Sequence, residues 1–302
     1  MSATDTVLYD APGPRARRRA LIGTVLATLA ILALIFVAFR RLAEQGQFSM
    51  ELWGPLINPA DENFAAVWRL LGLGLRATLI AASLAIVLSL AVGTALGTSR
   101  MMLGRTARIP LVGLIELFRG LPVVITIYYT SRVLPDLGVN VAPLPGDDGL
   151  WYLVIGLTLY NSVIIAEIIR AGVASLPSGQ GEAARAVGMT EGLTMRTVLL
   201  PQAFRTMLPA LISQLVVVLK DTSLAAVLGL YIELLRRGNI ISQNLHNPIQ
   251  TLFVVGLIFI LLNYGLSRLA VWTERRLARR GLGTGRSAAT AIESGVGGAA
   301  GA

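Results

Sequence analysis

The sequence contains no cysteine, one histidine and one lysine among its 302 residues, and only 14% of its residues are charged. Without cysteine, disulfide bonds, thiolate metal sites and cysteine nucleophiles are excluded. The single histidine, His246, cannot build a multi-histidine metal centre. The only lysine, Lys220, is followed by an aspartate, so the chain has no GxxxxGK[ST] phosphate-binding loop. We therefore expect no catalytic residue, metal or cofactor in this chain, and any energy from ATP must come from a partner protein.

Apolar residues are abundant. A hydrophobic content of 54% and a mean hydropathy of +0.68 exclude a water-soluble globular protein. A helix needs about 20 apolar residues to cross the hydrocarbon core of a membrane. Because the apolar runs show no strand-like alternation, we predict an all-α integral membrane protein with six transmembrane helices. The six runs lie at residues 20–39, 73–98, 109–134, 150–174, 208–230 and 251–271.

The basic residues indicate the orientation, because short loops rich in arginine and lysine stay in the cytoplasm. With the N-terminus inside, the inside segments hold 17 of the 26 basic residues. They include four arginines between residues 15 and 19, followed along the chain by Arg100, Arg105 and Arg108. We therefore predict a plasma-membrane protein with both termini in the cytoplasm. Since the positive charge is spread over separate loops, nucleic-acid binding is not indicated.

The runs also predict the organisation of the chain. The five later runs form one unit, and the first run stands outside it. The tail after Arg280 is rich in glycine and small residues, so we predict that it is largely disordered. The predicted segments are a cytoplasmic N-terminal segment (1–19), a first transmembrane helix (20–39), an external loop (40–72), a membrane core (73–271) and a cytoplasmic tail (272–302).

The longest inside loop, residues 175–207, is predicted to form two short helices. Helix formers fill residues 180–187, and Gly188 then supplies a C-terminal stop with a positive φ. Thr190 is placed to cap the second helix, which Pro201 bends or ends. Such an elbow lies along the membrane surface, and its small apolar face suits close contact with another protein.

The spacing within this loop resembles the EAA---G---------I-LP pattern of permease subunits of binding-protein-dependent ABC importers. The one departure is a valine in place of the isoleucine. The resemblance implies that this loop couples the permease to an ATPase partner. The residues that match the pattern are Glu182, Ala183, Ala184, Gly188, Val198, Leu200 and Pro201.

Three further segments resemble motifs of the polar amino-acid class of these permeases. They are ELFRGLP at 116–122, where threonine is more usual at Leu121, AEIIRAG at 166–172 and KDTSL at 220–224. The resemblance implies a MetI-like five-helix permease core over 73–271, with the first helix as an addition, in a bacterial cell membrane. The layout of the first helix and tail resembles the permease of a glutamate importer, which implies glutamate as the substrate.

The same resemblance implies a set of partners. They are two ATP-binding cassette subunits that bind ATP and magnesium, a second permease that is identical or related, an external solute-binding protein and the polar amino acid itself. Two rival functions are a self-sufficient ion-coupled secondary transporter and a non-transporting membrane scaffold. Neither rival explains the EAA spacing, and the choice between a homodimer and a heterodimer of permeases stays open.

Ionisable residues inside a membrane are costly, which makes them functional candidates. One reading is that six such polar residues line a translocation path for an amino acid. The other is that they hold helices together, with Glu116–Lys220 and Arg119–Asp221 as cross-helix pairs. Both readings stay open for Glu116, Arg119, Lys220, Asp221, Thr222 and Ser223.

Spacing predicts two local ion pairs. Glu116 and Arg119 are three residues apart, so they share one face of their helix. Glu167 and Arg170 have the same spacing near the inside end of another run, where we predict a structural pair. His246 is interpreted as an ordinary histidine of an external loop.

Overall fold

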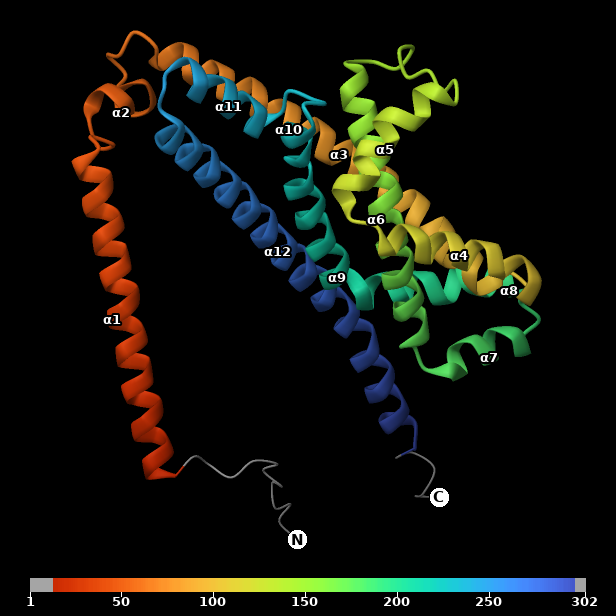
Figure 1. Ribbon diagram of the computed structural model, residues 1–302. Coiled ribbons are helices and arrows are strands. Elements are labelled where there is room, and N and C mark those ends of the chain that lie inside the picture. The colour runs from red at the N-terminus through yellow and green to blue at the C-terminus, as the bar shows by residue number, and fades with distance from the viewer. Residues whose placement is uncertain (1–12, 297–302) are drawn as a thin grey trace.

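The computed structural model describes the backbone of residues 13–296 and the side chains of residues 13–269 and 271–273. In this part of the chain all regular structure is helical, with no strand (Figure 1). The predicted all-α class is therefore confirmed. The helices are α1 (Pro14–Glu44), α2 (Met50–Ile57), α3 (Phe64–Met102), α4 (Arg105–Gly120), α5 (Val123–Asp136), α6 (Asp148–Ala174), α7 (Ser178–Ala186), α8 (Glu191–Thr194), the π-helix η1 (Met195–Leu199), α9 (Leu200–Asp221), α10 (Leu224–Leu228), α11 (Leu234–Asn244) and α12 (Pro248–Val296).

Five helical stretches of the described chain are long and apolar enough to cross a membrane. They are α1, α3, α6, the stretch Glu191–Leu228 that includes α9, and Pro248–Thr273 of α12. The pair α4 and α5 passes the same test together, and counting it as one broken span gives six. The number of predicted runs therefore agrees with the structure, although the third run has a different shape.

That third run, residues 109–134, does not form one straight helix. Its two halves, α4 and α5, are bent by 110° where Leu121 and Pro122 join them. Proline lacks a backbone N–H and forces the preceding residue out of the helical region. Leu121 accordingly has φ −85° and ψ 140°, an extended conformation. The expectation of a continuous span is wrong, and the Gly-Leu-Pro sequence was the signal for the break.

Helix α6 lies at the centre of the fold and packs against α3, α4, α5 and α9. Its contact with α3 depends on two glycines, Gly93 and Gly97. A Cβ atom added to Gly93 would lie 2.7 Å from the Ser162 carbonyl oxygen, and one added to Gly97 would lie 2.8 Å from that of Ala166. The G-x-x-x-G spacing thus lets two membrane helices approach to backbone contact.

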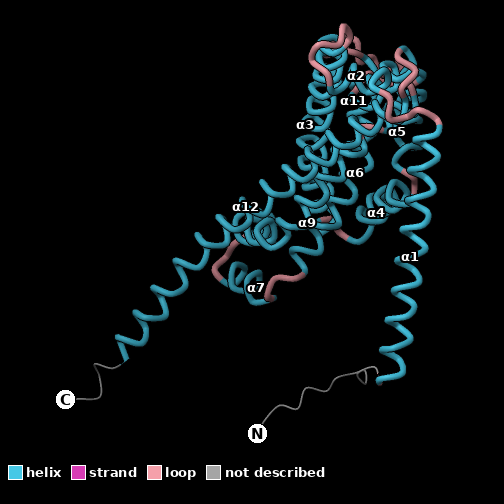
Figure 2. Tube along the Cα trace, turned by 90° about the vertical axis from the view of Figure 1, so that its left-hand side faces the viewer, coloured by secondary structure: helices cyan, strands magenta, loops and turns pink. Residues whose placement is uncertain are grey.

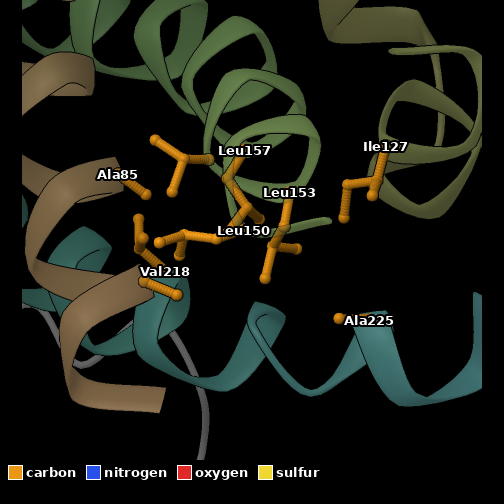
Figure 3. Packing of buried hydrophobic residues seen from close by; sticks show 9 residues of the cluster. Ala85, Ile127, Leu150, Leu153, Leu157, Val218 and Ala225 are labelled. Carbon is orange, nitrogen blue, oxygen red and sulfur yellow. The ribbon is translucent and has the colours of Figure 1, made fainter. Parts of the chain in front are cut away.

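The two larger hydrophobic clusters hold the helices together, the first around α6 and the second at a part of the fold that does not include α6. Figure 3 shows the first, in which side chains from α3, α5, α6, α9 and α10 meet. The second joins α2, the first part of α3, α11 and α12. The buried members of the first cluster are Ala81, Ala85, Ile127, Leu150, Leu153, Val154, Leu157, Val218 and Ala225. The buried members of the second cluster are Leu56, Val67, Leu71, Leu234, Ile241 and Val255.

Helix α1 stands apart from this core (Figures 1 and 2), and none of its residues is buried. The segment that follows it, predicted as the external loop 40–72, is largely helical and packs against the rest of the chain. It contains α2 and the start of α3, and Leu56 of α2 is buried. The side-chain amide of Asn247 donates to the Leu52 carbonyl oxygen at 3.0 Å, and that of Gln250 donates to the Gln47 carbonyl oxygen at 2.6 Å. These bonds join α2 and the turn before it to Asn247 and the first turn of α12.

Residues 1–12 of the predicted N-terminal segment and residues 297–302 of the predicted tail lie outside the described residues. Between residues 281 and 296, where we predicted disorder, the structure continues α12 as a helix. Adding residues to an existing helix avoids the cost of nucleation, which here outweighs the low helix propensity of the glycines.

The first turn of α11 is capped by a buried carboxylate that the sequence placed in an external loop. Glu233 is 0% exposed, and its carboxylate accepts hydrogen bonds from the backbone N–H groups of Leu235 and Arg236, each at 2.8 Å. The Thr78 hydroxyl of α3 donates to Glu233 at 3.5 Å and accepts from the Leu234 N–H at 3.1 Å. Burial raises the pKa of Glu233 above its usual value, although these hydrogen bonds act in the opposite direction.

This raised pKa predicts a pH-dependent stability. A raised folded-state pKa gives stability that is present below the ordinary value of 4.5 and is lost as the pH rises through the folded-state pKa. We expect the melting temperature of the native chain to fall relative to that of Glu233→Gln as the pH rises above 4.5. Thermal unfolding of the detergent-solubilised full chain checks this, with exposed Glu62→Gln as the control. A gap that stays constant or changes in the opposite direction contradicts it.

Candidate coupling site and translocation path

The first half of the elbow is α7, which ends as predicted at Gly188. This glycine has φ +88°, and its N–H donates to the Arg185 carbonyl oxygen at 2.9 Å. The next N–H, that of Met189, donates to the Ala184 carbonyl oxygen at 3.1 Å, so both bonds close the last turn. A Cβ atom on Gly188 would meet nothing within 4 Å. The requirement for glycine therefore comes from the backbone conformation alone.

The second half of the elbow begins at Thr190 as predicted, because the Thr190 hydroxyl accepts a hydrogen bond from the Leu193 N–H. Helical structure does not end at Pro201. It continues from α8 through η1 into α9, and Pro201 lies in the first turn of α9. The Leu200 N–H reaches the Met195 carbonyl oxygen, five residues back. This wider π turn accommodates a residue that has no N–H to donate.

The structure exposes most of the EAA pattern but not all of it. Ala184 is only 7% exposed and faces the interior of the chain, whereas Val187 is 79% exposed and Leu193 is 49% exposed. The two exposed apolar side chains flank Gly188, so they form the apolar face of the elbow. Within the pattern, Glu182, Ala183, Gly188 and Pro201 are exposed, while Val198 and Leu200 are half-buried.

Next to the elbow, the predicted Glu167–Arg170 pair is present in α6. The structure adds a partner that sequence reasoning missed, because an Arg100 guanidinium nitrogen of α3 lies 2.8 Å from the other Glu167 carboxylate oxygen. The Arg100 side chain is only 14% exposed. From the sequence, Arg100 indicates only the orientation of the chain. The Glu167 carboxylate therefore joins α6 to α3, and the distance between Glu167 and Arg100 along the sequence does not predict this contact.

The predicted pair of Glu116 and Arg119 also forms, with 2.9 Å between the carboxylate and the guanidinium group on α4. The cross-helix pairs Glu116–Lys220 and Arg119–Asp221 do not form. Among the described residues, no carboxylate lies within 4.0 Å of the Lys220 ammonium group. The physical reason is the position of Lys220, which is exposed in the last turn of α9, where a cation is favoured by the helix dipole.

The other polar residues of this segment terminate α9. The hydroxyl of Thr222, which is fully buried, donates to the Leu219 carbonyl oxygen at 2.7 Å. The hydroxyl of Ser223 donates to the Lys220 carbonyl oxygen, also at 2.7 Å. Asp221, the last residue of α9, is half-buried. The KDTSL segment is thus a structured helix end. Of its polar residues 220–223, only Lys220 has an exposed side chain.

Two polar features of the membrane region were missed by sequence reasoning. Between α6 and α9, the Gln214 side-chain amide donates to the buried Asn161 amide oxygen at 2.6 Å. In addition, a cavity of about 510 Å³ lies where α5, α6 and the end of α10 meet. The Arg132 guanidinium group at this cavity lies 5.6 Å from the centre of the Tyr128 ring. The cavity is lined by Tyr128, Ser131, Arg132, Gly149, Tyr152 and residues 227–230.

The described residues hold no group of three or more histidine, aspartate or glutamate side chains arranged to bind a metal ion. Residues 85–279 match the family described as binding-protein-dependent transport system inner membrane component. The chain belongs to this family. The resemblance first indicated by the EAA spacing is therefore confirmed, and the protein is a multi-pass membrane component of such a transport system.

Individual relatives are consistent with this assignment. The glutamate transport system permease protein GluD of Corynebacterium glutamicum is 41% identical over 237 residues, which cover 78% of this chain and 83% of GluD. The probable glutamine ABC transporter permease protein GlnP of Bacillus subtilis is 33% identical over 227 residues, covering 72% of this chain and 96% of GlnP.

Solved structures show the same fold. An amino acid ABC transporter crystallised with histidines has a TM-score of 0.62 at 29% identity, covering 70% of this chain and 96% of the matched chain. The MetNI methionine ABC transporter in an inward-facing conformation has a TM-score of 0.59 at 19% identity, covering 68% and 95%. The second likeness shows the fold alone, and it agrees with the MetI-like core implied by the sequence motifs.

The three-residue cluster around Glu167 predicts a stability effect. Glu167→Gln leaves the mostly buried Arg100 without its anionic partner, so we expect a loss of about 2 kcal/mol in the free energy of unfolding. Glu44→Gln is the matched control, because the Arg40–Glu44 pair is exposed and contributes less than about 1 kcal/mol. Unfolding of both variants in mixed detergent micelles checks the difference. Equal losses in the two variants would show that Glu167 does not join the helices.

Proposed function

We propose that this chain is the membrane permease subunit of an importer that takes up a polar amino acid, glutamate, using ATP hydrolysed by two partner ATP-binding cassette subunits. The observation that best supports this is the elbow of α7, Gly188 and α8. It carries the EAA pattern, and it presents exposed Val187 and Leu193 beside a glycine in the left-handed region. An ATPase subunit docks on this face in the proposed complex.

The elbow is suited to transmitting movement because its second helix is continuous with a membrane span. A displacement of α8 acts directly on η1 and α9, at whose far end the Lys220 segment lies. In the proposed cycle, closure of the ATPase subunits moves the elbow and opens the path outward, and hydrolysis resets it inward. The chain forms no covalent intermediate with the amino acid.

The proposed complex contains a second permease, identical or related, and an external solute-binding protein that delivers the amino acid. Both termini of the permease lie in the cytoplasm, as the distribution of arginines indicates. Glutamate is supported by the similarity to GluD and by two cations, Arg132 at the cavity and exposed Lys220. In this proposal Glu116, Arg119, Asp221, Thr222 and Ser223 also belong to the path or to its supports.

Uptake by the assembled complex in vesicles tests the function. We expect uptake of labelled glutamate that requires the binding protein on the outside and ATP with magnesium on the ATPase side. The purified permease alone should hydrolyse no ATP, because it lacks a phosphate-binding loop. Uptake driven by an ion gradient without ATP would support the secondary-transporter alternative and reject the proposal.

A pair of glycine substitutions tests the role of the elbow. Gly188→Val forces a β-branched residue into φ +88°, so we expect the ATPase to bind at least about tenfold more weakly and uptake to fall accordingly. Gly179→Val is the matched control, since it adds the same side chain in open space on α7 at an ordinary φ. Co-purification of the ATPase and vesicle uptake are the measurements. Normal docking and uptake in Gly188→Val would refute the assigned role.

Lys220 provides a separate test of the translocation path. Lys220→Met removes the charge of an exposed side chain at a helix end, so the complex should assemble and hydrolyse ATP. If Lys220 contacts the substrate, uptake should fall at least about tenfold, and Lys220→Arg should restore part of it. Assembly, ATP hydrolysis and uptake are measured on the same preparations. Failed assembly, or unchanged uptake, would instead assign Lys220 a structural role or none.

A further inference from the structure

A second cavity lies at the C-terminal end of α3, where the chain turns into α4. Its volume is about 560 Å³, and it is lined by Arg100, Leu103, Arg105, Arg108, Ile109 and Val112. Half of the lining residues are arginines and half are aliphatic. No motif of the sequence accounts for this cavity, and it is distinct from the elbow and from the Lys220 segment.

The polar half of the cavity has an excess of positive charge. Arg100 uses one terminal nitrogen on Glu167, but its Nε is buried and has no hydrogen-bond partner. Among the described residues, neither Arg105 nor Arg108 lies within 4.0 Å of a carboxylate. Both are exposed side chains. Of the three arginines that line the cavity, only Arg100 contacts a carboxylate, and Glu167 divides that carboxylate between Arg100 and Arg170, which leaves the cavity attractive to an anion.

The start of α4 adds to this field. Its N-cap residue, Gly104, supplies no side-chain acceptor, and no acidic residue lies in the first turn. The N-terminus of this 16-residue helix therefore offers free N–H groups and the positive end of the helix dipole beside Arg105 and Arg108. Arginines at a helix N-terminus are unfavourable by themselves, and a bound anion removes that conflict.

The apolar half of the cavity indicates which anion fits. Ile109 is 68% exposed and Leu103 is 40% exposed, and both border the arginines. A free phosphate gains nothing from aliphatic walls, whereas a phospholipid places its phosphate on the cations and its acyl chains on the aliphatic side chains. The cavity also adjoins the end of the membrane-spanning helix α3, which is the level at which lipid headgroups lie.

We propose that this cavity binds the phosphate headgroup of an anionic phospholipid. Arg105, Arg108 and the first N–H groups of α4 hold the phosphate, while Leu103, Ile109 and Val112 contact an acyl chain. In the orientation given under the proposed function this lipid belongs to the cytoplasmic leaflet, but the site itself does not depend on that orientation. The lipid lies next to the elbow, because the Met102 methyl group at the end of α3 would lie 3.4 Å from a Cβ added to Gly192 of α8.

Lipid titration of the full chain in neutral detergent micelles tests the site, with native mass spectrometry as the measurement. The probes are dioctanoyl phosphatidylglycerol, dioctanoyl phosphatidylcholine and inorganic phosphate. We expect the native chain to bind phosphatidylglycerol in preference to phosphatidylcholine. Arg105→Gln/Arg108→Gln should weaken that binding about tenfold or more, because each basic residue near a membrane surface attracts anionic lipid. Arg18→Gln/Arg19→Gln, which removes the same charge from exposed positions on α1, should leave it unchanged.

Three results would overturn the proposal. Equal loss of binding in the two double variants would show attraction to overall charge rather than to the cavity. Displacement of the lipid by millimolar inorganic phosphate would assign the site to a free anion. Unchanged lipid binding with loss of ATPase co-purification in Arg105→Gln/Arg108→Gln would assign the arginines to a protein contact. None of these results bears on ATP-driven uptake, so the proposed function stands or falls separately.

Discussion

The close contact between α3 and α6 is the interaction on which the rest of the structure depends. Gly93 and Gly97 bring the two backbones together, and a larger residue at either position would overlap a carbonyl oxygen of α6. Because lipid offers no hydrophobic driving force between helices, such close packing must supply the association energy. The same contact aligns Arg100 with Glu167 at one end of the pair, and the first hydrophobic cluster forms around the middle of it.

Several important positions lie where helices end. Pro122 separates α4 from α5, Gly188 ends α7, and Glu233 begins α11. At a helix end the backbone has unsatisfied N–H or C=O groups, which proline, glycine and polar side chains accommodate in different ways. Charged residues also cost less there than within a span, because they can offset the helix dipole. The elbow and the Lys220 segment follow from this property of helix ends, whereas the arginines of the basic cavity oppose the dipole of α4.

The elbow illustrates what local physics makes predictable. Gly188 adopts a positive φ and Thr190 caps the next helix, because both effects depend on a few neighbouring residues. The inward-facing Ala184 was not predictable in the same way. Whether an alanine of α7 faces a partner or its own chain depends on how α7 lies against η1, which nothing within the EAA pattern specifies.

The sequence by itself determined the helical membrane class, the number of apolar runs, the elbow and the ion pairs within α4 and α6, since composition and short-range spacing decide all of these. Only the tertiary structure decided that Arg100 joins Glu167, that Glu233 is buried against Thr78, and that Lys220 has no partner on α4. Such contacts depend on the rotation and crossing of helices distant in sequence. That geometry results from the packing of whole helix faces, so the spacing of charges along the chain does not reveal it.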